Sequence, residues 1–334
     1  MVWLKFAACL ASILFAGTKL ARYGDAIAEK TGLGRIWIGL VLLAAVTSMP
    51  ELVTGVSAAA LVKLPDLAVG NLLGSCLFNL VILAILDIIY RPAPILSQAS
   101  SRHVLSASVG IVLVAVVAGG ILGGGRFPGL ATGWVSAPGI IPLVLYIFSV
   151  WWILRFERSH RLQPIEVVSP QYEGLPIKTV YLRFALASAA IIGAGIWLSF
   201  IGGEIAATYS WHTSFVGSLF LAITTSLPEL VVCVAALRLG AIDMAVADIL
   251  GSNMFNLALI TPVDLAYRRG PVLSSVSGAH LVTAVVAIVM TLIVIAGLRF
   301  RQKRKTFSFI SWPAVALIGL YVFAMRYLFI SAIA

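Results

Sequence analysis

Charged residues are scarce in this chain of 334 residues. Only 11% of its residues are Asp, Glu, Lys or Arg, and 61% are apolar, whereas a soluble domain carries about 25% charged residues. The water-facing shell of a soluble globular protein is missing, so that class is excluded. Several apolar runs approach ~20 residues, long enough to cross a ~30 Å hydrocarbon core as a helix. These runs do not alternate with a period of two, so they predict spanning helices and not barrel strands.

Cysteine and the residues of enzyme active sites are also few. Cys9, Cys76 and Cys233 lie inside apolar stretches, where packing is expected and not disulfide bonding or metal ligation. No nucleophile or His/Cys constellation appears, so neither an enzyme nor a bound cofactor is expected. The net charge of +10 comes from basic residues between the apolar runs. This distribution is typical of loops that set the orientation of membrane spans, and it does not favour nucleic-acid binding. The expected partners are inorganic cations and the lipid bilayer, with no obligate protein partner.

Ten apolar segments are predicted to span the membrane. The connecting segments alternate between its two sides, and 17 of the 23 basic residues lie on the side that follows the first, third, fifth, seventh and ninth spans. The positive-inside rule places that side in the cytoplasm and both termini outside it. The compact length favours a prokaryotic inner membrane. The predicted spans are residues 2–21, 36–60, 66–89, 103–122, 137–155, 179–200, 213–237, 243–266, 280–298 and 310–332.

The sequence contains one internal repeat. Thr47-Ser-Met-Pro-Glu-Leu-Val53 matches Thr225-Ser-Leu-Pro-Glu-Leu-Val231 at an offset of 178, and Gly74-Ser-Cys-Leu-Phe-Asn79 matches Gly251-Ser-Asn-Met-Phe-Asn256 at an offset of 177. Each half, 1–155 and 179–334, holds five spans, an odd number, so the halves are expected to be inverted in the membrane. A short cytoplasmic linker, 156–178, joins them. The predicted fold is an all-α integral membrane protein of ten transmembrane helices in two inverted five-helix repeats, an arrangement of secondary transporters with a midplane ion site.

Two glutamates lie deep inside predicted spans, Glu51 in the second and Glu229 in the seventh. An ionised carboxylate there costs roughly 2.5–3.5 kcal/mol or more unless it faces a cavity, a cation or a proton. Each follows a proline, which removes a backbone donor and frees a carbonyl in the preceding turn, and such a carbonyl is a potential ligand for a hard cation. Hydroxyl groups lie about one turn before each carboxylate, roughly on its face. They belong to Thr47, Ser48, Thr225 and Ser226.

The third and eighth spans each carry a serine and an asparagine four residues apart, on one helix face. These are Ser75 with Asn79 and Ser252 with Asn256. All the candidate ligand atoms are therefore oxygens, which suits Ca²⁺, Na⁺ or Mg²⁺ better than Zn²⁺ or Cu⁺. The structural alternative is that Ser, Thr and Asn hold helices together in the membrane. That alternative explains a single hydroxyl more readily than it explains two glutamates in duplicated hydroxyl-rich motifs.

The duplicated motifs resemble the α-repeats of the cation/Ca²⁺ exchanger superfamily, in its sodium/calcium exchanger branch. The matching stretches are Thr47–Glu51 with Gly70–Asn79 and Thr225–Glu229 with Asp248–Asn256. The resemblance implies a diamond of ion positions that share Glu51 and Glu229, and alternating access in which the first and sixth helices slide across the other eight. By motif position the implied ligands are the side chains of Thr47, Ser48, Glu51, Ser75, Asn79, Thr225, Ser226, Glu229, Ser252 and Asn256, with the backbone carbonyls of Ala44 and Ala222.

Several positions depart from the family pattern. Val46 and Thr224 stand where a glycine is usual, and Cys76 replaces an asparagine. Both closing positions, at 79 and 256, are asparagine, whereas sodium/calcium members often carry one aspartate there. Asp248, matched by Asn71 in the first half, forms an i, i+4, i+8 row with Ser252 and Asn256. Asp248 is a candidate ligand, a group lining the access route, or the partner of an ion pair.

The leading hypothesis is a secondary antiporter that exchanges Ca²⁺ for Na⁺. Two carboxylates neutralise one Ca²⁺, and replacing it with Na⁺ keeps those charges balanced. The alternative is H⁺-coupled exchange of Ca²⁺ or another cation, in which Glu51 and Glu229 take up protons when the cation leaves. A channel would need a continuous pore, and broken helices with buried paired carboxylates suit occlusion better.

Overall fold

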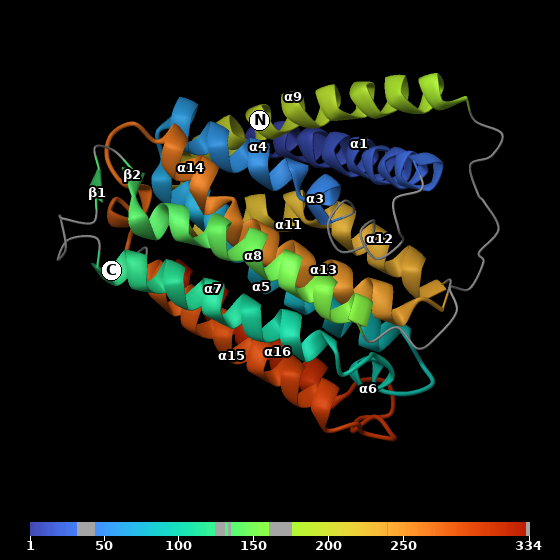
Figure 1. Cartoon of the computed structure of the whole chain (residues 1–334). Helices are drawn as coiled ribbons and strands as arrows, with labels where there is room; N and C mark the ends of the chain where they lie inside the picture. Colours follow the sequence, from blue (N-terminus) through green and yellow to red (C-terminus); the bar gives the residue numbers. More distant parts are fainter. Residues whose placement is uncertain (32–43, 124–130, 133–134, 160–175, 239, 332–334) are drawn as a thin grey trace.

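The computed structural model describes residues 1–31, 44–123, 131–132, 135–159, 176–238 and 240–331 (Figure 1). The chain is almost entirely helical within these ranges, as predicted. Seven helices are long and apolar enough to cross a membrane, and Thr213–Thr225 with Leu227–Arg238 forms an eighth candidate that is bent by 42°. The count of ten spans stays a prediction, because Met49–Val62 and Ala137–Ile153 are shorter and residues 36–43 of the second predicted span lie outside the described ranges.

Seven of the predicted spans correspond to unbroken helices. α1 and α9 continue beyond the predicted ends at residues 21 and 200. The unbroken helices are α1 (Val2–Thr31), α5 (Pro65–Ile89), α7 (His103–Gly123), α8 (Ala137–Ser159), α9 (Ile177–Tyr209), α15 (Ala279–Arg299) and α16 (Trp312–Ile330).

The second, seventh and eighth spans are divided into shorter pieces. The described part of the second consists of α3 (Ala44–Thr47), α4 (Met49–Ser57) and the π-helical η2 (Ala58–Val62). The seventh and eighth comprise α10 (Thr213–Val216), the π-helical η4 (Gly217–Leu221), α11 (Ala222–Thr225), α12 (Leu227–Arg238), α13 (Ile242–Ala258) and α14 (Ile260–Ala266).

Short elements lie between the spans. A two-stranded antiparallel hairpin, not predicted from the sequence, pairs β1 (Ala131–Thr132) with β2 (Val135–Ser136). The hairpin lies at the opposite end of the bundle from α6 (Ile95–Gln98) (Figure 1). The remaining element is the 3₁₀ helix η5 (Val272–Ser274).

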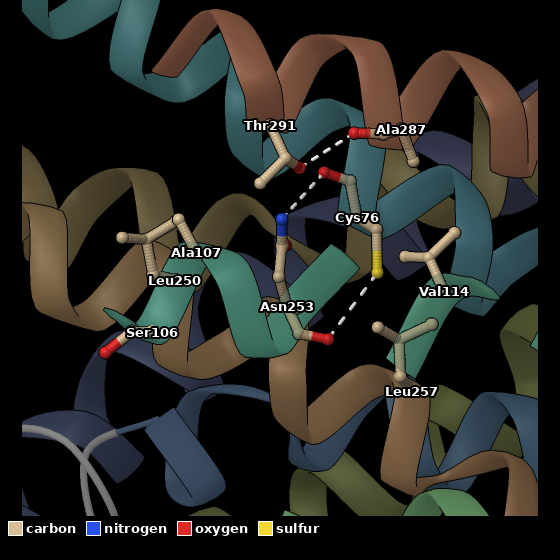
Figure 2. A pocket seen from close by; sticks show the side chains of 10 residues that line it. Cys76, Ser106, Ala107, Val114, Leu250, Asn253, Leu257, Ala287 and Thr291 are labelled. Atoms are coloured by element: carbon tan, nitrogen blue, oxygen red, sulfur yellow. Dashed lines mark hydrogen bonds between the residues drawn. The ribbon is translucent and has the colours of Figure 1, made fainter. Parts of the chain in front are cut away.

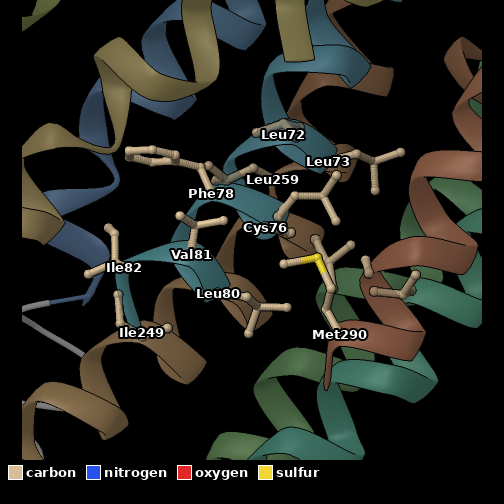
Figure 3. Close-up of a cluster of buried hydrophobic side chains, with 14 of the residues drawn as sticks. Leu72, Leu73, Cys76, Phe78, Leu80, Val81, Ile82, Ile249, Leu259 and Met290 are labelled. Atoms are coloured by element: carbon tan, nitrogen blue, oxygen red, sulfur yellow. The ribbon is translucent and has the colours of Figure 1, made fainter. Parts of the chain in front are cut away.

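The centre of the molecule is built from α5 and from α13 with α14. In the most apolar 18-residue stretch of each of these two spans 83% of the residues are buried, against 28–50% in the corresponding stretches of the other five unbroken candidates. Apolar side chains project from α5 in several directions, including Leu72, Leu73, Leu80 and Ile82 (Figure 3). α1 packs along α9 on one side of this centre, and α7, α15 and α16 cover the other (Figure 1). A helix that is apolar on most of its surface is expected to be buried, and the buried α5 also carries the polar side chains of Ser75 and Asn79.

Aspartates at the ends of the central spans hold the neighbouring loops. The carboxylate of Asp87 accepts hydrogen bonds from the backbone N–H groups of Ile95 and Ser311, both at 2.8 Å. Its repeat counterpart Asp264 accepts from the N–H groups of Val272 (2.6 Å) and Ser136 (3.1 Å). Both acids therefore anchor the ends of their spans to the following loops and to a neighbouring span.

The aspartates at the starts of α5 and α13 link the two halves of the chain. Asp66 accepts from the backbone N–H of Ser277 at 2.7 Å and contacts His280 Nε2 at 3.1 Å. Asp243 makes the corresponding contacts with Ser100 N (2.6 Å) and His103 Nε2 (2.9 Å). Each half therefore holds the first turn of a helix that belongs to the other half.

The three cysteines are buried and free, as predicted.

Candidate cation site

Both glutamate-bearing spans break at the serine that precedes the Met/Leu-Pro-Glu sequence. Ser48 has φ −86° and ψ 13°, and Ser226 has φ −90° and ψ 7°, which are bridge-region values and not helical ones. The cause lies two residues further on, where Pro50 and Pro228 lack an N–H and crowd the preceding turn. Identical breaks at repeat-related positions bring the hydroxyl and carboxylate groups to the same depth.

The two repeats exchange hydrogen bonds at these breaks. The Ser48 hydroxyl donates to Glu229 Oε1 at 2.9 Å, and the Ser226 hydroxyl donates to Glu51 Oε1 at 2.8 Å. Each carboxylate is therefore bound by a serine from the other half of the chain. All four side chains are fully buried, so the two predicted motifs form one site in the interior.

The third span completes one side of this site. The Ser75 hydroxyl lies 3.5 Å from Glu51 Oε1 and 3.4 Å from the hydroxyl of Thr225. Thr225 Oγ1 also lies 3.2 Å from Asn71 Oδ1, and Asn71 Nδ2 donates to the backbone oxygen of Glu51 at 3.4 Å. Asn71 was not predicted as a site residue. The only sequence signal for it was its repeat match to Asp248.

Several polar atoms of the predicted site have no hydrogen-bond partner among the described residues. Native proteins seldom leave buried polar groups in this state, and each case requires an explanation such as a bound ion or water. The side chains concerned are at most 1% exposed. The atoms are Glu51 Oε2, Glu229 Oε2, Asp248 Oδ1, Ser252 Oγ and both amide atoms of Asn79 and of Asn256.

No basic side chain neutralises this site in the part of the chain that the structure describes. The ion pairs there join Lys5 to Glu204, His103 to Asp243, His280 to Asp66 and Lys305 to Asp87. No three His, Cys, Asp or Glu side chains in those ranges converge as a metal centre by themselves. Carboxylate oxygens together with hydroxyl and amide oxygens fit a hard cation such as Ca²⁺ or Na⁺.

The remaining predicted ligands, the backbone carbonyls of Ala44 and Ala222 and the hydroxyl of Thr47, already take part in hydrogen bonds within their own spans. The Ala44 carbonyl accepts hydrogen bonds from Ser48 N (3.0 Å) and Thr47 Oγ1 (3.2 Å). The Ala222 carbonyl likewise accepts from Ser226 N at 3.1 Å. Both carbonyls therefore already serve the helix turn before the break, and a cation there would share them. The Thr47 side chain is buried next to Ser48, and its hydroxyl donates to the Ala44 carbonyl in the same turn.

Cys76 and Asn253, which occupy equivalent positions in the two repeats, meet where α5 crosses α13. The amide of Asn253 donates to the backbone oxygen of Cys76 at 3.1 Å, and the Cys76 thiol lies 3.7 Å from the backbone oxygen of Asn253 (Figure 2). A small cavity adjoins this contact and is lined in addition by Ser106 and Thr291. The departure from the family pattern at Cys76 thus falls on a helix crossing and not on a cation ligand.

The sequence profile of the family described as sodium/calcium exchanger protein matches residues 1–155 and 179–330. The chain belongs to this family. Sodium/calcium exchanger proteins are transporters, and the long apolar helices described above make this member a multi-pass membrane protein.

A curated relative agrees with a membrane assignment. The inner membrane protein YrbG of Escherichia coli strain K12 is 29% identical over 275 residues, a match that covers 77% of this chain and 80% of that protein.

Solved structures show that the fold is shared with exchangers. The sodium-calcium exchanger NCX_Mj superposes with a TM-score of 0.62 at 21% identity, over 98% of this chain and 99% of that one. The H⁺/Ca²⁺ exchanger CAX superposes with a TM-score of 0.70 at 12% identity, over 99% of this chain and 86% of that one. At these identities the likeness concerns the fold, which is common to exchangers with different coupling ions.

Proposed function

We propose that this member of the sodium/calcium exchanger family is a secondary antiporter that exchanges Ca²⁺ for Na⁺. One observation carries the proposal: Glu51 and Glu229 are fully buried, each accepts a hydrogen bond from a serine hydroxyl of the other repeat, and each keeps one oxygen without a partner among the residues that the structure describes. Two unneutralised carboxylates in a membrane interior are costly. A cation between them offsets that cost, and a site that must release the cation cannot hold a fixed basic partner.

The proposed ligand set contains the side chains that the repeat brings together. Glu51 and Glu229 supply the charge, the hydroxyls of the third and eighth spans and of the two breaks supply neutral oxygens, and Asn79 and Asn256 close the set. The full set is Thr47, Ser48, Glu51, Ser75, Asn79, Thr225, Ser226, Glu229, Ser252 and Asn256, with the carbonyls of Ala44 and Ala222. Asp248, the remaining candidate from the sequence, lies beside this set.

The mechanism proposed for this site is alternating access between two inverted repeats, 1–155 and 179–334. In this mechanism α1 and α9 move together across the remaining helices. Two features support the pairing: α1 and α9 pack against each other along their lengths, and both contact the broken spans that carry the glutamates.

We further propose an inner-membrane location with both termini outside the cytoplasm.

The alternative to Na⁺-coupled exchange is H⁺-coupled exchange at the same site. Asn79 and Asn256 carry no charge, so the site holds fewer fixed negative charges than sodium/calcium members that have an aspartate at one closing position. In the H⁺-coupled cycle protons replace the departing Ca²⁺ on Glu51 and Glu229.

The test is ⁴⁵Ca uptake into proteoliposomes under an imposed Na⁺ gradient and then under a pH gradient. Na⁺-driven uptake supports the proposal, and uptake that follows only the pH gradient supports the H⁺-coupled cycle. Glu51→Gln and Glu229→Gln are each expected to lower uptake at least about 100-fold, because a divalent ion loses one of two carboxylates in a weakly screening interior.

The matched control is Glu204→Gln. Glu204 is also a glutamate on a spanning helix, but it is partly exposed and paired with Lys5, so its replacement should leave uptake within about twofold of wild type. All variants are checked for insertion by membrane yield and monodispersity in detergent. Wild-type uptake by either glutamine variant of the site would contradict the assignment.

A further inference from the structure

Asp248 is a third acid buried beside the proposed site. It is 1% exposed, and no basic side chain in the described part of the chain pairs with it. The Cys233 thiol lies 3.5 Å from Asp248 Oδ2, while Oδ1 has no partner among the described residues. The ion-pair explanation considered from the sequence is therefore not what the structure holds. A buried carboxylate with a free oxygen points to a cation as its missing partner.

The place of Asp248 along the helices separates it from the central ligands. It precedes Ser252 by four residues on α13, which is about 6 Å along the axis. Its contact Cys233 follows Glu229 by four residues on α12, in the direction of Arg238. Both helices thus put Asp248 one turn away from Glu229, toward the membrane face where α12 ends and α13 begins.

The first repeat has no charge at the equivalent position. Asn71 stands there, and its side chain is used internally, by the Glu51 backbone and the Thr225 hydroxyl. The start of α13 lies where α5 finishes, because Asp243 contacts Ser100 just beyond α6. The two helices therefore run in opposite directions, and Asn71 is offset from the centre toward the other membrane face. The acid is present on one side of the site only.

A single acid on one side of an ion site acts on cations that arrive from that side. In a narrow, weakly polar surrounding its field is focused, which raises the local cation concentration. From the opposite face the same charge acts over a longer distance, and a cation bound between the central carboxylates offsets part of it.

We propose that Asp248 is a one-sided cation-capture group: it binds a partly dehydrated Ca²⁺ or Na⁺ one turn from Glu229 on the α12–α13 face and passes it to the central site. This inference rests on the proposed antiport function. It assigns to the protein different apparent cation affinities on its two faces, a difference that the symmetric motifs alone would not produce.

The experiment measures the Ca²⁺ concentration for half-maximal exchange on each face. Everted and right-side-out membrane vesicles are prepared from the same expressing cells, and the readout is the ratio of the two concentrations. For Asp248→Asn the half-maximal Ca²⁺ concentration on the α12–α13 face is expected to rise roughly 10-fold relative to that on the other face. This is the effect of removing one unit charge about one helical turn from the cation, in surroundings whose dielectric constant lies between those of water and of the protein interior. Asp248→Glu keeps the charge and should keep the ratio near that of wild type.

A mirror variant tests the same idea without removing Asp248. Asn71→Asp adds an acid on the opposite side, and it should lower the half-maximal concentration on that face relative to the α12–α13 face. The replacement also removes the hydrogen bond from Asn71 Nδ2 to the Glu51 backbone, which would affect both faces alike, so the ratio between the faces is the readout even where Asp248→Asn fails to insert.

Two results would overturn the proposal. Equal changes on both faces would make Asp248 a ligand of the central site, and no change with either variant would make it a packing residue. Failure of the antiport function itself is recognised separately, because wild-type vesicles would then show no Ca²⁺ exchange before any variant is compared.

Discussion

At the scale of single residues, the reciprocal bonds from Ser48 to Glu229 and from Ser226 to Glu51 define the site. A hydrogen bond to a charged group contributes about 1.5–3 kcal/mol. It also aims one carboxylate oxygen at the serine and leaves the second oxygen for the cation. Since the two bonds are related by the repeat, they should be similar in strength.

Ser48→Ala and Ser226→Ala are therefore predicted to weaken exchange to a similar degree. Each should raise the Ca²⁺ concentration for half-maximal exchange roughly 10- to 100-fold, the equivalent of the lost bond, while the protein still inserts. The measurement is ⁴⁵Ca exchange across a Ca²⁺ series.

The control is Ser108→Ala. Ser108 is exposed on α7 and its hydroxyl donates only to Val104 O in its own helix, so its loss should not change the half-maximal concentration. A strong effect from one site serine and none from the other would show that the two halves do not contribute equivalently.

At the scale of helices, glycines mark where the outer pair crosses the broken spans. A Cβ added to Gly17 on α1 would lie 2.5 Å from Pro228 Cγ, and one added to Gly195 on α9 would lie 2.9 Å from Val53 Cγ1. These two glycines are themselves related by the repeat offset of 178. Each outer helix thus passes closely over the glutamate-bearing helix of the other repeat, in the turns that follow its break.

Gly195→Ala is predicted to reduce exchange, because the added methyl group must displace α9 or the side chain of Val53. The expected effect is a loss of about 1–3 kcal/mol of stability, seen as a lower melting temperature in detergent, with slower Ca²⁺ exchange. Gly193→Ala on the same helix is the control, since nothing lies within 4 Å of its added Cβ. Equal behaviour of the two variants would rule out a close crossing at Gly195.

At the scale of the whole molecule, contacts between the halves hold the two sets of helices in register. Asp66 with His280 and Asp243 with His103 join helix starts from different repeats at the two ends of the central spans. The orientation of this assembly in the membrane follows from the distribution of basic residues and stays a prediction.

Lys303→Cys and Arg269→Cys are predicted to label from opposite sides. Both positions are exposed, and the three native cysteines are buried, so a membrane-impermeant maleimide should report the introduced thiol. The positive-inside rule predicts that Lys303→Cys reacts in everted vesicles and Arg269→Cys in right-side-out vesicles. The reverse result would invert the topology and with it the face on which Asp248 acts.

The sequence by itself determined the membrane class, the repeat, and the glutamates, serines and asparagines of the site. These follow from local physics: apolar length decides what crosses a membrane, proline decides where a helix breaks, and buried acids are rare enough to be conspicuous. Only the tertiary structure decided which serine meets which glutamate, that Asn71 joins the site, and that Asp248 has no basic partner in the described part of the chain. Those are contacts between residues more than a hundred positions apart or between neighbouring helices, and their geometry depends on how the repeats pack together, which spacing along the chain does not encode.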